Sequence, residues 1–294
     1  MKNSIEHDHF FSMEKRKTAF LRLFCNQLFT TFCILLSFVT LIPLFSLLYL
    51  LLRKGLPLLS FSLFTQLPPA PGLQGGGFGN AIVGTLTMVT LGTLLSAPIG
   101  ILGAIFVHEY AGDTLLASLI RFVGKLLAGI PSIICGAFAF ALVVLKTGQF
   151  SALAGGVALS ILMLPTIFIT AEQSLLDVSS SYRNAAYGLG ATPFQTIWSV
   201  VLPEALPGMI MGIMLAVARA AGETAPILFT ALFSQYWIHS LLEPTASLSV
   251  LIYNFSALPY HHQVQMAWTA SLVLVAMVTG TNILTHYCLR KKLS

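Results

Sequence analysis

The chain has 294 residues, of which 56% are hydrophobic and only 9% are charged, and its mean hydropathy is +0.86. An average soluble domain carries about 25% charged residues, so this composition excludes an ordinary soluble protein and predicts a polytopic membrane protein in a lipid bilayer. The formal charge of +5 comes largely from basic residues beside the first and last apolar runs. We interpret them as topology signals and expect no nucleic-acid partner.

The uncharged stretches are apolar all round and do not alternate, which predicts helices and not barrel strands. Six of them reach the roughly 18 residues that a span needs. In chain order they are about Leu28 to Leu52, Ile82 to Val107, Leu126 to Leu145, Leu153 to Thr170, Leu206 to Phe233, and Ala267 to Leu289. We expect an all-α transmembrane bundle in three parts: a cytoplasmic segment 1–27, a membrane domain 28–289 and a cytoplasmic tail 290–294.

An even number of spans places both termini on one side of the membrane. If that side is the cytoplasm, most of the 15 basic residues lie inside, so we expect a multi-pass inner-membrane protein with both termini cytoplasmic. Pro131 and Pro165 fall inside the third and fourth spans and predict kinks there. Both prolines are interpreted as setting helix shape, and a pathway role for Ser132 is left open.

Polar residues in the outer loops offer weaker signals. The glycine-rich run from Gly75 to Asn80 fits either a phosphate nest or a flexible turn ahead of a helix, and the missing Walker lysine favours the turn. His261 and His262 lack a third ligand at a recognisable spacing. The cysteines are scattered through apolar stretches. We therefore expect neither a metal site nor a disulfide.

The longest polar inner segment covers residues 171–205. Within it, Ser181 to Leu189 can form a short helix that Gly190 ends in a left-handed conformation. Thr192 then offers an N-cap, followed by a proline and a capping-box glutamine. The pattern predicts a second short helix that Pro203 stops.

These two short helices form a compact unit, residues 181–203, which we call the knob. A self-capped connecting loop is one interpretation. The other is a coupling element, because the knob resembles the EAA motif of ABC importer permeases, in which Glu-Ala-Ala precedes a glycine and Ile-x-Leu-Pro. The matching positions within the coupling loop 172–205 are Asn184, Ala185, Ala186, Gly190, Val200, Leu202 and Pro203. Asn184 replaces the glutamate of that motif and Val200 replaces its isoleucine.

The resemblance extends from Gly76 to about Phe233 and is closest to phosphate-specific ABC importer permeases of the PstA type. It rests on Asn80 to Thr85, Pro98 to Ile101, Glu109-Tyr110, Gly129 to Ile133, the knob and Ala218 to Pro226. It implies a MetI-like type I importer fold and a phosphate-transporting permease that is not an enzyme. It also implies three partners: a second permease of the PstC type, an ATPase dimer of the PstB type and an external phosphate-binding protein of the PstS type. ATP would be used by the ATPase, with no cofactor on this chain.

Arg219 and Glu223 lie within the fifth span, where each charge would cost roughly 2.5 to 3.5 kcal/mol if it faced lipid. Their i, i+4 spacing allows pairing on one helix face. They flank a stripe of small residues, Gly208, Gly212, Ala216 and Ala220, that predicts close approach of another helix.

The charged pair is either purely structural or part of the substrate pathway. In the pathway interpretation Arg219 attracts phosphate with its planar fork of donors, and Glu223 holds Arg219 and prevents overly tight binding. Thr224 would cap a second half-helix between Gly222 and Pro226. A permease for another oxyanion or a phosphonate is the alternative. An intramembrane enzyme would need a nucleophile with its base, or paired aspartates, within the spans. The predicted spans of this chain hold neither, so no catalytic residue is expected.

Overall fold

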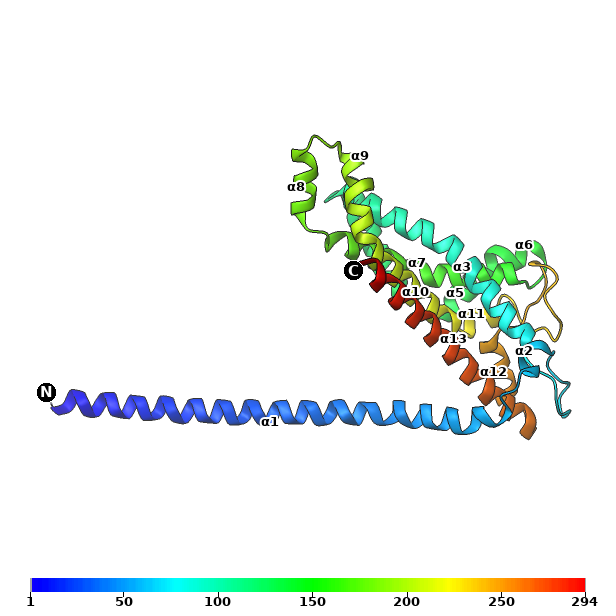
Figure 1. The fold of residues 1–294 in the computed structure, drawn as a ribbon, viewed down its shortest axis with the longest axis horizontal. Helices are drawn as coiled ribbons and strands as arrows, with labels where there is room; N and C mark the ends of the chain where they lie inside the picture. Colours follow the sequence, from blue (N-terminus) through cyan, green and yellow to red (C-terminus); the bar gives the residue numbers. More distant parts are fainter. Residues whose placement is uncertain (1, 294) are drawn as a thin grey trace. The chain divides into compact units, whose positions relative to one another are not determined.

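The computed structural model describes the backbone of residues 2–293 and the side chains of residues 22–287, apart from 24, 284 and 286. These residues form helices joined by turns and loops, and the described backbone contains no strand, which confirms the all-α prediction. The chain divides into two units, residues 1–53 and 54–294 (Figure 1).

The first unit is one long helix. α1 (Lys2–Gly55) contains the first predicted span, and its most apolar part begins at Cys25. A single helix has no partner within its own unit, so its apolar side chains from Cys25 onward need lipid or another protein surface to leave water.

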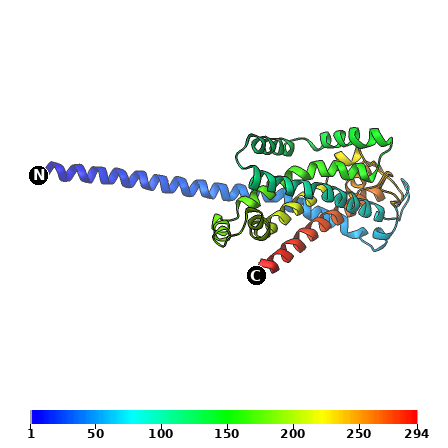
Figure 2. The ribbon, with the colours of Figure 1, turned by 90° about the horizontal axis from the view of Figure 1, so that it is seen from above.

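The second unit is a bundle built around two long helices. α3 (Gly79–Ile105) and α7 (Ala152–Leu176) lie side by side, and α10 (Leu202–Ala221) packs against α7 (Figure 1, Figure 2). A Cβ on Gly156 would lie 2.7 Å from Leu91 Cβ, so only glycine permits this approach of α7 to α3. α13 (His261–Leu293) packs against α10 and α12 (Leu248–Ser256).

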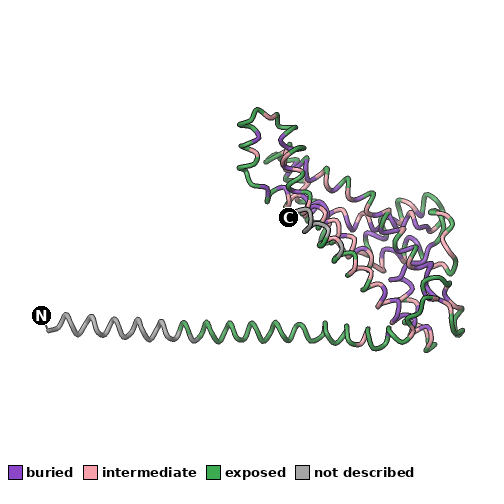
Figure 3. The backbone as a smooth tube through the Cα atoms, viewed as in Figure 1, coloured by how far each residue is buried: buried purple, intermediate pink, exposed green. Residues whose placement is uncertain are grey.

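The core of the second unit lies in clusters spread along the bundle (Figure 3). One cluster, with Phe168, Leu175 and Met209, lies where α3, α7 and α10 meet near the knob. Another, with Phe78 and Met266, lies at the other end of the bundle. The remaining short elements are η1 (Leu56–Leu58), α2 (Ser62–Thr65), η2 (Phe106–Ala111), α4 (Leu115–Ala128), α5 (Ser132–Ala139), η3 (Phe140–Val144), α6 (Leu145–Thr147), α8 (Ser180–Gly188), α9 (Pro193–Thr196), η4 (Ile197–Val201) and α11 (Ala225–Leu228).

The kink predicted at Pro131 in the third span is confirmed, and it is a sharp break between two helices. α4 and the helix that begins at Ser132 meet at 105°, with the break at residues 129–131. Pro131 has no N–H to continue the α4 ladder, and its ψ of 134° turns the backbone out of the helix. The described helices therefore include five that are long and apolar enough to cross a membrane, or six if this bent pair is one span.

The predicted boundaries of the fifth span are wrong. Pro203 does not stop the second knob helix, because one continuous helix runs from Pro193 to Ala221 and ends before the predicted Phe233. The π-helical turns of η4 end at Val201, two residues before Pro203. A wider turn moves the preceding carbonyls away from the proline ring, which relieves the usual clash. α7 likewise continues through Pro165.

Candidate functional site

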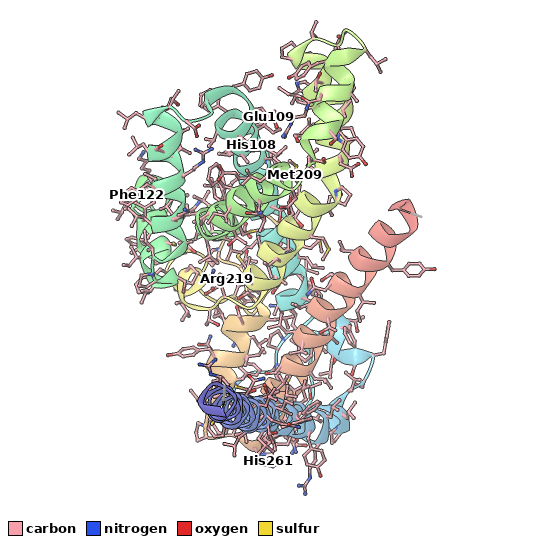
Figure 4. The ribbon with its side chains drawn as sticks, turned by 90° about the vertical axis from the view of Figure 1, so that its left-hand side faces the viewer. His108, Glu109, Phe122, Met209, Arg219 and His261 are labelled. Atoms are coloured by element: carbon pink, nitrogen blue, oxygen red, sulfur yellow. The ribbon has the colours of Figure 1, made fainter. Side chains whose placement is uncertain are left out.

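The predicted charged pair lies where α10 ends. Arg219 is in the last turn of α10, and its Nε atom is 3.6 Å from Glu223 Oε1 (Figure 4). The two side chains are 48% and 19% exposed. The i, i+4 pairing is confirmed, but 3.6 Å is longer than a hydrogen bond. Most donors of the Arg219 guanidinium therefore remain available for another group.

The helix break predicted between Gly222 and Pro226 is present. α10 ends at Ala221, and the short helix α11 follows Thr224. Ser249 of α12 donates its hydroxyl to the Glu223 carbonyl over 2.7 Å and so anchors the break. On another side of the break, Gly136 lets α5 lie close to Pro226 of α11, because a Cβ on Gly136 would lie 2.6 Å from Pro226 Cα.

The Thr224 cap predicted for the second half-helix is absent. Its side chain accepts no hydrogen bond from α11, and its φ of −110° and ψ of −50° are not the extended conformation of an N-cap. α11 has only four residues, which is too short for the aligned peptide dipoles that would attract an anion. Thr224 stays next to Glu223, but not in the role that the sequence suggested.

The local structure of the knob follows its sequence signals. α8 ends before Gly190, whose φ of +85° lies in the left-handed region. Thr192 and Gln195 form the predicted capping box: the Thr192 hydroxyl accepts from the Gln195 N–H over 3.3 Å, and the Gln195 side chain accepts from the Thr192 N–H over 2.9 Å. A tight, self-capped turn therefore joins α8 to α9.

The motif residues separate into two groups. Asn184, Ala185 and Gly190 are exposed in α8 and its turn, whereas Ala186 is buried within the chain. Leu202 and Pro203 begin α10 and do not share the turn. Large apolar side chains are also exposed over the knob: Tyr182, Tyr187, Leu189 (91% exposed), Phe194 and Trp198. Such a patch is typical of a surface that contacts another protein.

The glycine-rich run before α3 serves close packing. A Cβ on Gly79 would collide with the Phe64 carbonyl. The buried Asn80 donates to the carbonyls of Ser234 and Tyr236 over 3.0 and 3.2 Å, and so pins the loop after α11. This arrangement favours the turn interpretation over a phosphate nest. The described residues contain no group of three or more potential metal ligands among His, Cys, Asp and Glu.

Two arginines outside the six predicted spans form ion pairs. Arg121 pairs with Glu172, and Arg183 pairs with Glu109. The partners are 51 and 74 residues apart in the chain. No spacing rule joins residues at such separations, so the sequence does not predict either pair.

Comparisons with known proteins agree with these features. The family model described as "Binding-protein-dependent transport system inner membrane component" matches residues 96–292. The phosphate transport system permease protein PstA of Yersinia pestis is 38% identical over 81% of this chain and 81% of its own length. That of Haemophilus influenzae is 39% identical over 83% and 86%. A probable PstA of Methanocaldococcus jannaschii is 32% identical over 94% and 97%.

Solved structures show the same fold. A bacterial alginate ABC transporter chain superposes with a TM-score of 0.64 at 15% identity, covering 90% of this chain and 94% of that chain. A chain of the MetNI methionine ABC transporter gives a TM-score of 0.59 at 19% identity, covering 72% and 94%. The predicted MetI-like importer fold is confirmed. The chain therefore belongs to the binding-protein-dependent transport system inner membrane components and, within them, to the phosphate transport system permease proteins PstA.

Proposed function

We propose that this permease subunit imports inorganic phosphate and that Arg219 attracts the anion on its way through the membrane. The observation that carries the proposal is the loose pairing of Arg219 with Glu223, at 3.6 Å and with the guanidinium side chain half-exposed. By contrast, Arg121 and Arg183 each make several hydrogen bonds to the bundle. Relatives over most of the chain are named as phosphate transport permeases.

Charge and geometry explain how the pair would act. A guanidinium presents a planar fork of donors that matches two phosphate oxygens. Glu223 repels the same anion, which keeps binding weak enough for release. The bond from Ser249 to the Glu223 backbone holds the pair at the α10 break. A purely structural pair would not need a half-exposed arginine.

Arg219 lies on the exposed face of α10. Leu215 and Met211, one and two turns earlier, are also exposed, whereas Gly212 and Ala216 are buried. An exposed charge in a membrane span must face water or another protein. We infer that a second, PstC-type permease subunit covers this face and that the anion passes between the two subunits.

The knob would couple transport to ATP hydrolysis. Its exposed apolar side chains fit a cleft of a PstB-type ATPase dimer, with Asn184 facing the partner in place of a glutamate. The ATPase would use ATP, and this chain would bind no cofactor. A PstS-type phosphate-binding protein would deliver the anion from outside, and both termini would be cytoplasmic.

Uptake of radiolabelled phosphate by cells that depend on this importer tests the proposal. We expect Arg219→Gln to lower uptake roughly 10- to 100-fold, since it removes charged hydrogen bonds. Arg219→Lys should retain part of the activity because it keeps the charge without the fork. Lys146→Gln, which removes one charge from another exposed site, is the matched control and should transport normally. Unchanged uptake in an assembled Arg219→Gln complex would refute the pathway role.

A permease for another oxyanion or a phosphonate remains the second candidate, because Arg219 would suit those ligands as well. Competition distinguishes the two in the wild-type importer. If phosphate is the substrate, unlabelled phosphate should lower the uptake of radiolabelled phosphate, while an equal concentration of a phosphonate should not. Preferential uptake of labelled phosphonate would select the second candidate.

A further inference from the structure

Arg183 reaches from the knob into the bundle. It lies in α8, and its Nη2 atom donates to Glu109 Oε1 over 2.7 Å and to the Leu175 carbonyl over 3.2 Å. Glu109 belongs to η2, which continues α3, and Leu175 lies in the last turn of α7. One guanidinium therefore joins the knob to the ends of two long helices.

The pair is largely shielded from solvent. The side chain of Arg183 is 22% exposed and that of Glu109 is 10% exposed. His108 Nε2 lies 3.3 Å from Arg183 Nη2, and Figure 4 places His108 and Glu109 next to each other at this end of the bundle. A charge-assisted bond in such surroundings is stronger and more directional than an exposed surface pair.

A second arginine fixes η2 without touching the knob. Arg121 of α4 donates to the carbonyls of Val107 and Gly112 over 3.5 and 3.2 Å, and it pairs with Glu172 of α7. The wide π-helical turns of η2 are a conformation that occurs frequently at functional sites. The same six-residue segment is therefore held by α4 on the bundle side and by α8 on the knob side.

The other contacts of α8 are apolar and less directional than the hydrogen-bonded pair of Arg183 and Glu109. α8 packs against α9 and η4, which belong to the knob itself, and Ala186 and Ile197 are buried there. Among the described side chains of α8, that of Arg183 is the one that hydrogen-bonds to the bundle. Apolar contact is non-directional and tolerates small sliding movements, whereas a hydrogen bond depends on distance and angle.

We propose that the Arg183–Glu109 pair is a strut that makes α3 follow the knob when an ATPase moves it. The inference rests on the proposed function, since the ATPase is the partner that would displace the knob. With the pair intact, movement of α8 pulls on η2 and hence on α3. Without the pair, α8 can slide on its apolar contacts, and its movement reaches α3 only indirectly, through α7. Arg183 and Glu109 are positioning residues, because they contact neither phosphate nor ATP in this scheme.

The test measures how many phosphate ions the complete importer moves per ATP hydrolysed, in proteoliposomes supplied with the phosphate-binding protein. We expect Arg183→Gln to keep ATP hydrolysis but to lower this ratio roughly tenfold. Arg183→Lys should restore part of it. Glu109→Gln, which changes charge but hardly changes shape, should also lower the ratio and serves if Arg183→Gln does not assemble. Arg121→Gln is the matched control and should keep the wild-type ratio.

An unchanged ratio in assembled Glu109→Gln and Arg183→Gln complexes would overturn the strut. An equal fall in Arg121→Gln would also overturn it, because general damage to η2 would then explain the loss. Failure of the proposed function is visible separately, in the wild-type complex. If that complex moves a different anion, the ratio is measured with that anion and the strut is still tested. If it contains no ATPase, both proposals fall.

Discussion

At the scale of single residues, glycine decides how closely α10 approaches α7. A Cβ on Gly208 would collide with Ser174, and a Cβ on Gly212 would collide with the Thr170 hydroxyl. Ala216 and Ala220 continue the same stripe and are buried. Lipid tails are as apolar as the side chains, so close van der Waals contact between small residues is a main source of helix association in a membrane.

Gly212→Ala should therefore destabilise the subunit by about 1–3 kcal/mol, since α7 and α10 must move apart to admit the methyl group. Thermal unfolding of the purified protein in detergent measures the effect. Gly280→Ala in α13 is the matched control, because a Cβ there meets nothing within 4 Å. Equal melting temperatures of the two variants would contradict the close-packing argument.

At the scale of elements, the knob is defined by its own backbone signals. The positive φ of Gly190 and the capping box at Thr192 set the turn between α8 and α9 without help from the rest of the chain. A Cβ on either Gly188 or Gly190 would meet nothing within 4 Å. Differences between alanine variants at these positions therefore report backbone conformation alone.

Gly190→Ala should destabilise the knob by about 1–2 kcal/mol, because the left-handed region penalises a side chain. Gly188→Ala, in helical α8, should be stabilising by up to about 1 kcal/mol. Hydrogen exchange of the amides in residues 180–196 measures both effects, with faster exchange expected in the first variant and slower exchange in the second. Similar exchange in both would show that the turn does not control the knob.

At the scale of the whole molecule, the number of crossings depends on the bent pair of α4 and α5. The described helices that are long and apolar enough to cross a membrane number five if this pair turns back, and six if it spans. An odd number places the termini on opposite sides of the membrane, and an even number places them on one side. The basic residues before the first apolar run and after the last favour one side, the cytoplasm.

Reporter fusions that are active only outside the cytoplasm decide between these counts. We expect fusions at the N-terminus and at the C-terminus to be inactive, and a fusion after Lys146 to be active, because the bent pair crosses the membrane. Opposite results at the two termini would show that α4 and α5 form a re-entrant loop.

Two prolines show the limit of what the local sequence predicts: Pro131, which precedes α5, and Pro203, at the end of the knob. Pro131 breaks its helix by 105°, whereas Pro203 lies within a continuous helix after the π-helical η4. Both carry the same local signal. Whether a chain accommodates a proline by bending or by widening the preceding turn depends on the helices packed around it.

The sequence by itself determined the fold class, the family, the knob with its caps and the charged pair at Arg219. These features rest on composition, on motifs or on contacts within four residues, where helix geometry fixes the distances. Only the tertiary structure decided the size of the bend at Pro131, 105°, and the continuous helix through Pro203. It also revealed the pairing of Arg183 with Glu109, which are 74 residues apart. Residues at such a separation meet only because whole helices pack, and packing depends on surfaces formed by many residues together.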